Sequence, residues 1–178
     1  MNRTLRQRVA GLALTVGVVA ASPAHAQAVC GSPMQTTLVA GQSYAAGIIM
    51  ISNDASYVYL TYETSTPWLM SEAHVAVATS VDGIPQTKTG NPIPGRFAYN
   101  ATFDPETSSY VFTIPLASLG TSLSSLFIAA HAIVQAPQDL GGTQTGWGQG
   151  TSFPGKNWAM YMNYIVQSCG GGSGGGNS

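Results

Sequence analysis

The stretch Ser56–Thr64, SYVYLTYET, alternates two kinds of side chain with a period of two residues. Val58, Leu60 and Tyr62 fall on one face, and the residues between them fall on the other. This period is that of a half-buried β-strand. The preceding segment Tyr44–Asn53 is rich in β-branched and small apolar residues and ends at the turn pair Asn53-Asp54. The two segments therefore predict a β-hairpin.

The same reasoning extends outward in both directions. Further strands are predicted at Trp68–Ser80, Arg96–Phe103, Ser109–Pro115, Leu126–Gln135 and Asn157–Gln167. Asp104-Pro105-Glu106 predicts a second hairpin between two of them, and only Pro115–Ser125 resembles a helical turn. Short strands separated by turn signals predict an all-β fold, a single antiparallel β-sandwich over residues 27–169, with a closed β-barrel as the alternative.

The two ends of the chain predict its destination. The chain begins with basic residues, continues with an apolar run over Val9–Ala21 and then has small residues at Ala24-His25-Ala26. This is the order of a secretory signal peptide, so we assign residues 1–26 to a signal peptide. Ala26-Gln27-Ala28 offers a second cleavage site. The run of glycine and serine over residues 170–178 predicts a flexible tail. We expect a protein secreted to the periplasm, the cell surface or the medium.

Cys30 and Cys169 lie near the two ends of the predicted domain. Two cysteines of an exported domain most often pair, because the compartment is oxidising. We therefore expect a disulfide that closes nearly the whole domain, with two free thiols as the alternative.

Charge narrows the range of partners. Without the signal peptide the chain has three cations, Lys88, Arg96 and Lys156, against seven anions. So few unclustered cations argue against a nucleic-acid partner and against attachment to an anionic membrane, and no membrane insertion is expected.

Two connections are longer than ordinary loops, Asp82–Gly95 and Ala136–Lys156. The first contains Gly90-Asn91-Pro92-Ile93-Pro94-Gly95. Together with Glu72-Ala73-His74, Gly83–Lys88, Ala129–Ala132 and Asn157–Tyr161, this motif resembles a family of secreted, largely uncharacterised bacterial surface domains, over about residues 40 to 166. The resemblance implies a secreted β domain and carries no functional residues.

Glu72, His74 and His131 form the sharpest candidate cluster. Glu72 and His74 are two residues apart in a strand and share a face. If the strand that contains His131 is a neighbour, the three could bind zinc or another transition metal. The alternative is an exposed Glu–His pair beside a hydrogen-bonded core histidine.

Aromatic side chains suggest a different site. Trp147 lies in a polar stretch with Gln144 and Gln149, and an exposed indole there could stack on a sugar. Trp68 is a further candidate. The alternative is that these rings are core or loop anchors.

No paired carboxylates, nucleophile elbow or free thiol points to catalysis, so an enzyme is not favoured and no cofactor is expected. The leading hypothesis is a non-catalytic secreted protein of a cell-surface coat or extracellular matrix, whose partners are surface polysaccharide, another matrix protein or its own copies. A carbohydrate-binding module is the first alternative and a small metal-dependent enzyme the second.

Overall fold

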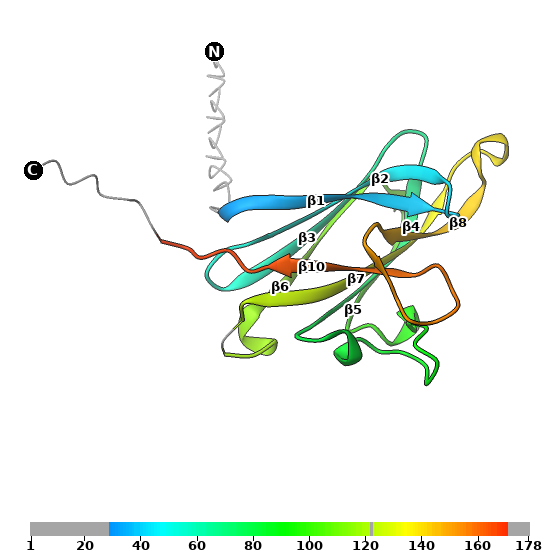
Figure 1. Cartoon of the computed structure of the whole chain (residues 1–178). Helices are drawn as coiled ribbons and strands as arrows, with labels where there is room; N and C mark the ends of the chain where they lie inside the picture. Colours follow the sequence, from blue (N-terminus) through cyan, green and yellow to red (C-terminus); the bar gives the residue numbers. More distant parts are fainter. Residues whose placement is uncertain (1–28, 122, 171–178) are drawn as a thin grey trace, which may run out of the picture.

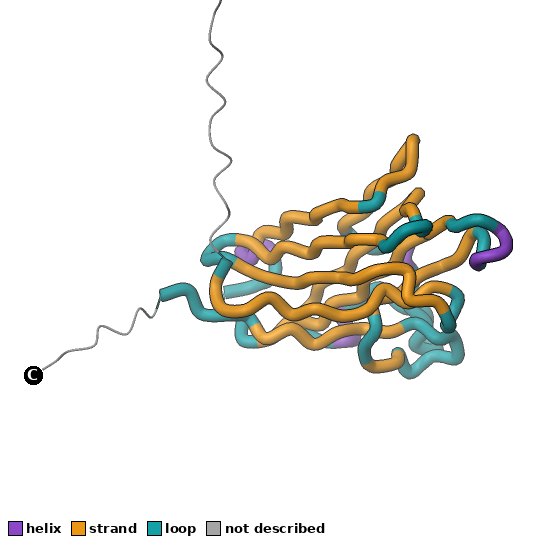
Figure 2. Tube along the Cα trace, turned by 90° about the horizontal axis from the view of Figure 1, so that it is seen from above, coloured by secondary structure: helices purple, strands orange, loops and turns teal. Residues whose placement is uncertain are grey.

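The computed structural model describes residues 29–121 and 123–170. The proposed signal peptide and residues 171–178 of the tail lie outside the described residues. The strands are β1 Cys30–Ala40, β2 Tyr44–Asn53, β3 Tyr57–Thr64, β4 Leu69–Ala78, β5 Tyr99–Thr107, β6 Ser109–Pro115, β7 Ser125–Gln135, β8 Thr143–Gly148, β9 Thr151–Ser152 and β10 Met160–Ile165. The connections between the described strands contain four short 3₁₀ helices: η1 Val81–Gly83, η2 Pro94–Arg96, η3 Leu116–Ser118 and η4 Gln138–Leu140. Figure 2 shows these short helices in the loops that join the strands. None of the described helices is long and apolar enough to cross a membrane.

The strands form one antiparallel sheet in the order β5-β4-β7-β8-β1-β2-β3-β6, and β10 also pairs with β7. This sheet is nearly closed into a barrel-like shape (Figure 1). The predicted all-β antiparallel fold is confirmed, and the continuous ladder corresponds to the barrel named as its alternative. The predicted hairpin of Tyr44–Asn53 with Ser56–Thr64 is confirmed as β2 and β3.

The predicted hairpin around Asp104–Glu106 is wrong. β5 continues to Thr107, and it pairs with β4 whereas β6 pairs with β3. β5 and β6 are therefore the two edges of the sheet, on either side of its open seam. At this seam the rings of Phe103 and Tyr110 lie 5.0 Å apart between centroids, so side-chain contact bridges the edges.

The interior of the barrel holds one continuous apolar cluster. Its largest fully buried members come from most of the long strands: Leu38, Ile49, Ile51, Leu60, Tyr62, Met70, Ile114, Leu126, Ile128, Met162 and Tyr164. A second cluster contains Ala76, Ile84, Phe97, Ala129, Trp147, Phe153 and Ala159. Val75 belongs to the first cluster and Ala76 to the second, so the second lies on the outer face of β4. The long connections before β5 and before β10 thus fold onto the outside of the sheet.

A disulfide closes the end of the barrel at the start of β1. Cys30 and Cys169 form a disulfide, as the sequence predicted. Next to it, Asn53 is 1% exposed and uses both atoms of its amide. Its Oδ1 accepts hydrogen bonds from the hydroxyl of Tyr164 and the N–H of Gln167. Its Nδ2 donates to the carbonyls of Gln167 and Asp54. The segment after β10 is therefore held to the end of β2.

Candidate functional site

Glu72 and His74 project from the outer face of β4. The residues that flank His74, Ala73 and Val75, are fully buried in the interior cluster, so the alternate side chains point outward. His74 Nε2 and Glu72 Oε2 are 3.1 Å apart. The predicted same-face pair therefore exists as a hydrogen-bonded Glu–His contact.

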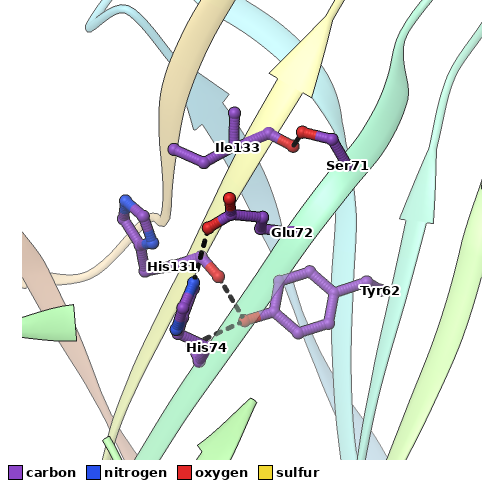
Figure 3. A network of polar contacts seen from close by, with 6 residues as sticks. All are labelled: Tyr62, Ser71, Glu72, His74, His131 and Ile133. Atoms are coloured by element: carbon purple, nitrogen blue, oxygen red, sulfur yellow. Dashed lines mark hydrogen bonds and ion pairs between the residues drawn. The ribbon is translucent and has the colours of Figure 1, made fainter. Parts of the chain in front are cut away.

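His131 on β7 lies directly opposite His74 in the β4–β7 register. The two rings are 5.4 Å apart between centroids and tilted by 55°. Figure 3 shows Glu72, His74 and His131 close together, with both histidine rings on one side of the strands. The structure thus brings together the three residues that the sequence suggested as metal ligands.

Among residues 29–121 and 123–170, no group of three or more His, Cys, Asp or Glu side chains is arranged to hold a metal ion. The Nδ1 atoms of His74 and His131 are both buried without a hydrogen-bond partner. Metal binding by Glu72, His74 and His131 stays a prediction.

Burial changes the acid–base chemistry of His131, which is 6% exposed. Removal from water, and secondly the nearby charge of His74, lower the pKa of His131 to about 4. The His131 ring is therefore neutral at physiological pH. The indole of Trp147 packs against this ring, at a centroid distance of 4.8 Å.

Tyr62 supports the same pair of strands from the interior. Its hydroxyl lies 3.2 Å from the carbonyl oxygen of His74 and 3.1 Å from that of His131 (Figure 3). Burial raises the pKa of Tyr62 well above its usual value, so the hydroxyl keeps its proton and acts as a donor.

Trp147 does not lie in an exposed loop. It is on β8, directly opposite His131, and is only 5% exposed. Its ring contacts those of His131 and Phe97, at centroid distances of 4.8 and 6.4 Å. The sequence suggested an exposed Trp147 that stacks on a sugar, whereas the buried ring agrees with the alternative, that it is a core anchor.

Trp68 is likewise unavailable to a ligand. It is 6% exposed and packs against Tyr44, with the ring centroids 5.6 Å apart. Gln144 is also committed locally, since its Nε2 donates to the carbonyl of Gly141 at 2.6 Å.

Gln149 is the sugar-binding candidate that remains at the surface. It lines a groove of about 320 Å³ together with Val39, Gln42, Ser152, Trp158 and Met160. Sequence reasoning did not single out Gln42 or Trp158 as groove residues. Gln42 lies in a turn between two strands, the first of which was not predicted.

The Gly90–Gly95 motif shapes the connection that covers the second cluster. Asn91 exchanges backbone and side-chain hydrogen bonds with Thr87, and its Oδ1 accepts the N–H of Asn157. Gly155 lies so close to Asn91 that an added Cβ would collide with the Asn91 side chain. The motif therefore locks the two long connections together.

Searches against protein-family models, curated proteins and solved structures return no match. The fold and the site define the chain as a disulfide-closed, barrel-like antiparallel β domain. On its outer face the partly buried His74 and the buried His131 and Trp147 lie in a row across three strands. An open groove lies at the β1–β2 turn and the connection from β8 to β10.

Proposed function

We propose that this chain is a non-catalytic, secreted building block of a cell-surface coat or extracellular matrix, which assembles with copies of itself. The observation that supports this proposal best is the unpaired edge of β6. The disulfide and the low charge of the chain support it as well, since disulfides persist outside the cytoplasm.

The hydrogen-bond pattern defines which backbone groups of β6 are free. Leu116 N–H donates to Ser56 O, and Thr64 N–H donates to Ser108 O, at the two ends of the β3–β6 ladder. Bonded pairs alternate along an antiparallel ladder, so the N–H and C=O groups of Val111 and Thr113 point away from β3. The N–H and C=O groups of Ser109 are already hydrogen-bonded to the hydroxyl of Thr107.

The composition of β6 leaves this edge open to pairing. The strand SYVFTIP has no charged residue, and Val111 is 47% exposed. β5, on the other side of the seam, contains Asp104, Pro105 and Glu106. Charged side chains on an edge strand oppose the addition of another strand, whereas proline does not distinguish the two edges, because β6 ends in Pro115. Of the two seam edges, β6 is therefore the one suited to assembly.

A second copy of β6 is the partner that this edge fits. In an antiparallel pair with Phe112 on the two-fold axis, Val111 of each copy lies opposite Thr113 of the other. The free N–H groups of Val111 and Thr113 in each copy then donate hydrogen bonds to free carbonyls of the other copy. No like charges meet, because β6 has none.

Two substitutions at one position test this pairing. Thr113→Pro removes an N–H that the β3–β6 ladder does not use, so the fold should persist while pairing is lost. Thr113→Ala keeps the N–H and serves as the matched control. Analytical ultracentrifugation of the mature domain over a concentration series should show reversible self-association for the wild type and for Thr113→Ala, and a monomer for Thr113→Pro.

Val111→Lys provides a second variant in case proline disturbs the strand. It places a charge on the edge without removing a backbone donor, and we expect a monomer with a melting temperature close to that of the wild type. A wild-type protein that stays monomeric at its solubility limit would contradict the proposal. Undiminished association of both Thr113→Pro and Val111→Lys would contradict it equally.

A further inference from the structure

We infer that the groove between the β1–β2 turn and the connection from β8 to β10 binds a neutral glycan. Its lining residues are Val39, Gln42, Gln149, Ser152, Trp158 and Met160, and they enclose about 320 Å³. In Figure 1 the ends of β1 and β8 and the connection that leads to β10 lie next to one another. This site differs from the one at Trp147 that the sequence suggested.

The backbone at Gln42 is the first argument. Gln42 has a φ of 67°, and it is the one residue other than glycine with a positive φ in the part of the chain that the structure describes. The left-handed region disfavours a side chain of this kind, whereas glycine adopts it freely. Uncommon backbone conformations of this kind gather at binding sites. A glutamine at this position is explained if its amide serves the groove.

Gln149, a second amide of the lining, has a firmly placed backbone. Its N–H donates to the carbonyl of Thr37 at 2.8 Å, and its carbonyl accepts the hydroxyl of Thr36 at 2.8 Å. The next residue, Gly150, lies against the backbone of Tyr161 so closely that a Cβ would collide with it. The amide of Gln149 therefore extends from a fixed main chain.

Trp158 supplies an aromatic side chain to the same lining. It packs against the outer hydrophobic cluster and remains partly exposed. An indole supported in this way can offer a flat apolar surface to the C–H face of a sugar ring at little entropic cost.

The lining determines the class of ligand. Two amides and the Ser152 hydroxyl can both donate and accept hydrogen bonds, as sugar hydroxyls require. No charged side chain lines the groove, so nothing in it would neutralise an acidic sugar. A larger hollow of about 490 Å³ contains Asp82 and Lys88 and has no aromatic side chain in its lining, which makes it a poorer fit to a neutral glycan.

Glycan binding gives the proposed coat protein a partner and does not require the β6 edge. The two ideas can fail separately, because Thr113→Pro should abolish self-association and leave glycan affinity unchanged.

Affinity electrophoresis and isothermal titration with laminarin, xylan, galactomannan, dextran and hydroxyethylcellulose test the inference, with heparin as the charged comparison. We expect at least one neutral polysaccharide to bind and heparin not to bind. Trp158→Ala should weaken that affinity by about tenfold or more, as removal of an aromatic anchor does. Gln149→Ala should weaken it without changing the melting temperature.

Gln42→Gly gives the sharpest outcome, because it removes the amide and relieves the backbone. We expect lower affinity with an unchanged or raised melting temperature. Gln138→Ala, outside the groove, should bind as the wild type does. The inference fails if no neutral polysaccharide binds. It fails too if Gln42→Gly and Gln149→Ala both keep full affinity.

Discussion

Asn53 binds both backbone groups of Gln167, accepting its N–H at 2.8 Å and donating to its carbonyl at 3.0 Å. These residues are 114 positions apart, and Asn53 lies directly opposite Cys30 in the β1–β2 register. One buried amide therefore joins the end of β2 to the segment that leads to Cys169. The same end of the barrel is closed by the disulfide and by these hydrogen bonds.

Asn53→Ala should destabilise the fold by about 2–4 kcal/mol, because the buried Tyr164 hydroxyl and both backbone groups of Gln167 lose their partner. Asn53→Asp should cost more at neutral pH, since a carboxylate would face two carbonyl oxygens. Urea unfolding measures both. A loss below about 1 kcal/mol for Asn53→Ala, the net value of a single hydrogen bond, would contradict this account.

Replacing Cys30 and Cys169 together by serine should lower the free energy of unfolding by about 2–5 kcal/mol, since the closed loop spans most of the domain. Urea unfolding of the oxidised wild type and of the double variant gives the difference. The reduced wild type should match the variant. If two thiols can be titrated in the wild type purified without a reductant, the prediction that Cys30 and Cys169 are paired is wrong.

Gly155→Ala should destabilise the fold by about 1–3 kcal/mol, because the new methyl group would collide with Asn91 and separate the two long connections. Gly95→Ala is the matched control in the same region, since a Cβ there meets nothing within 4 Å. Thermal unfolding compares the two. Equal melting temperatures would show that the connections are not locked at Asn91.

His131 should make the fold sensitive to acid. Its pKa is lowered to about 4, mainly by burial, whereas in the unfolded chain it lies near 6.5. Between these values the unfolded state binds a proton that the folded state does not, so stability falls as the pH drops. The difference corresponds to about 3 kcal/mol at most.

His131→Leu should remove the contribution of His131 to the pH dependence of the free energy of unfolding. Urea unfolding at a series of pH values between 4 and 7 measures this dependence. His74→Gln should reduce it, because the charge of His74 is the second cause of the shift. An unchanged pH profile in His131→Leu would assign the acid sensitivity to other groups.

β2, β3, β6 and β7 lie within one residue of their predicted bounds. Alternation predicted β3, which turns Val58, Leu60 and Tyr62 into the apolar interior, whereas β2 and β7 were predicted from runs of apolar or β-branched residues. The sequence also placed Glu72 and His74 on one face correctly, since that relation depends on the strand period alone.

β1 and β8 escaped prediction for a physical reason. β1 begins CGSPMQTT, with glycine, proline and few apolar residues, and β8 contains two glycines. β1 and β8 pair with each other although they lie far apart in the sequence, and no local pattern predicts such a pairing. The burial of Trp147 corresponds to the alternative that its ring is a core anchor, but its place on a strand was missed, because β8 was read as a loop. Gln42 became visible as a candidate only once the turn between β1 and β2 was known.

A coat or matrix protein stays with the cells that produce it. Its location can be measured by quantitative immunodetection in a producing culture separated into washed cells, extracellular matrix and cell-free medium, with the assembly state determined in each fraction. We expect most of the protein in the washed-cell or matrix fraction, in an assembled form. Recovery of the protein only from cell-free medium, as a monomer, would contradict this expectation.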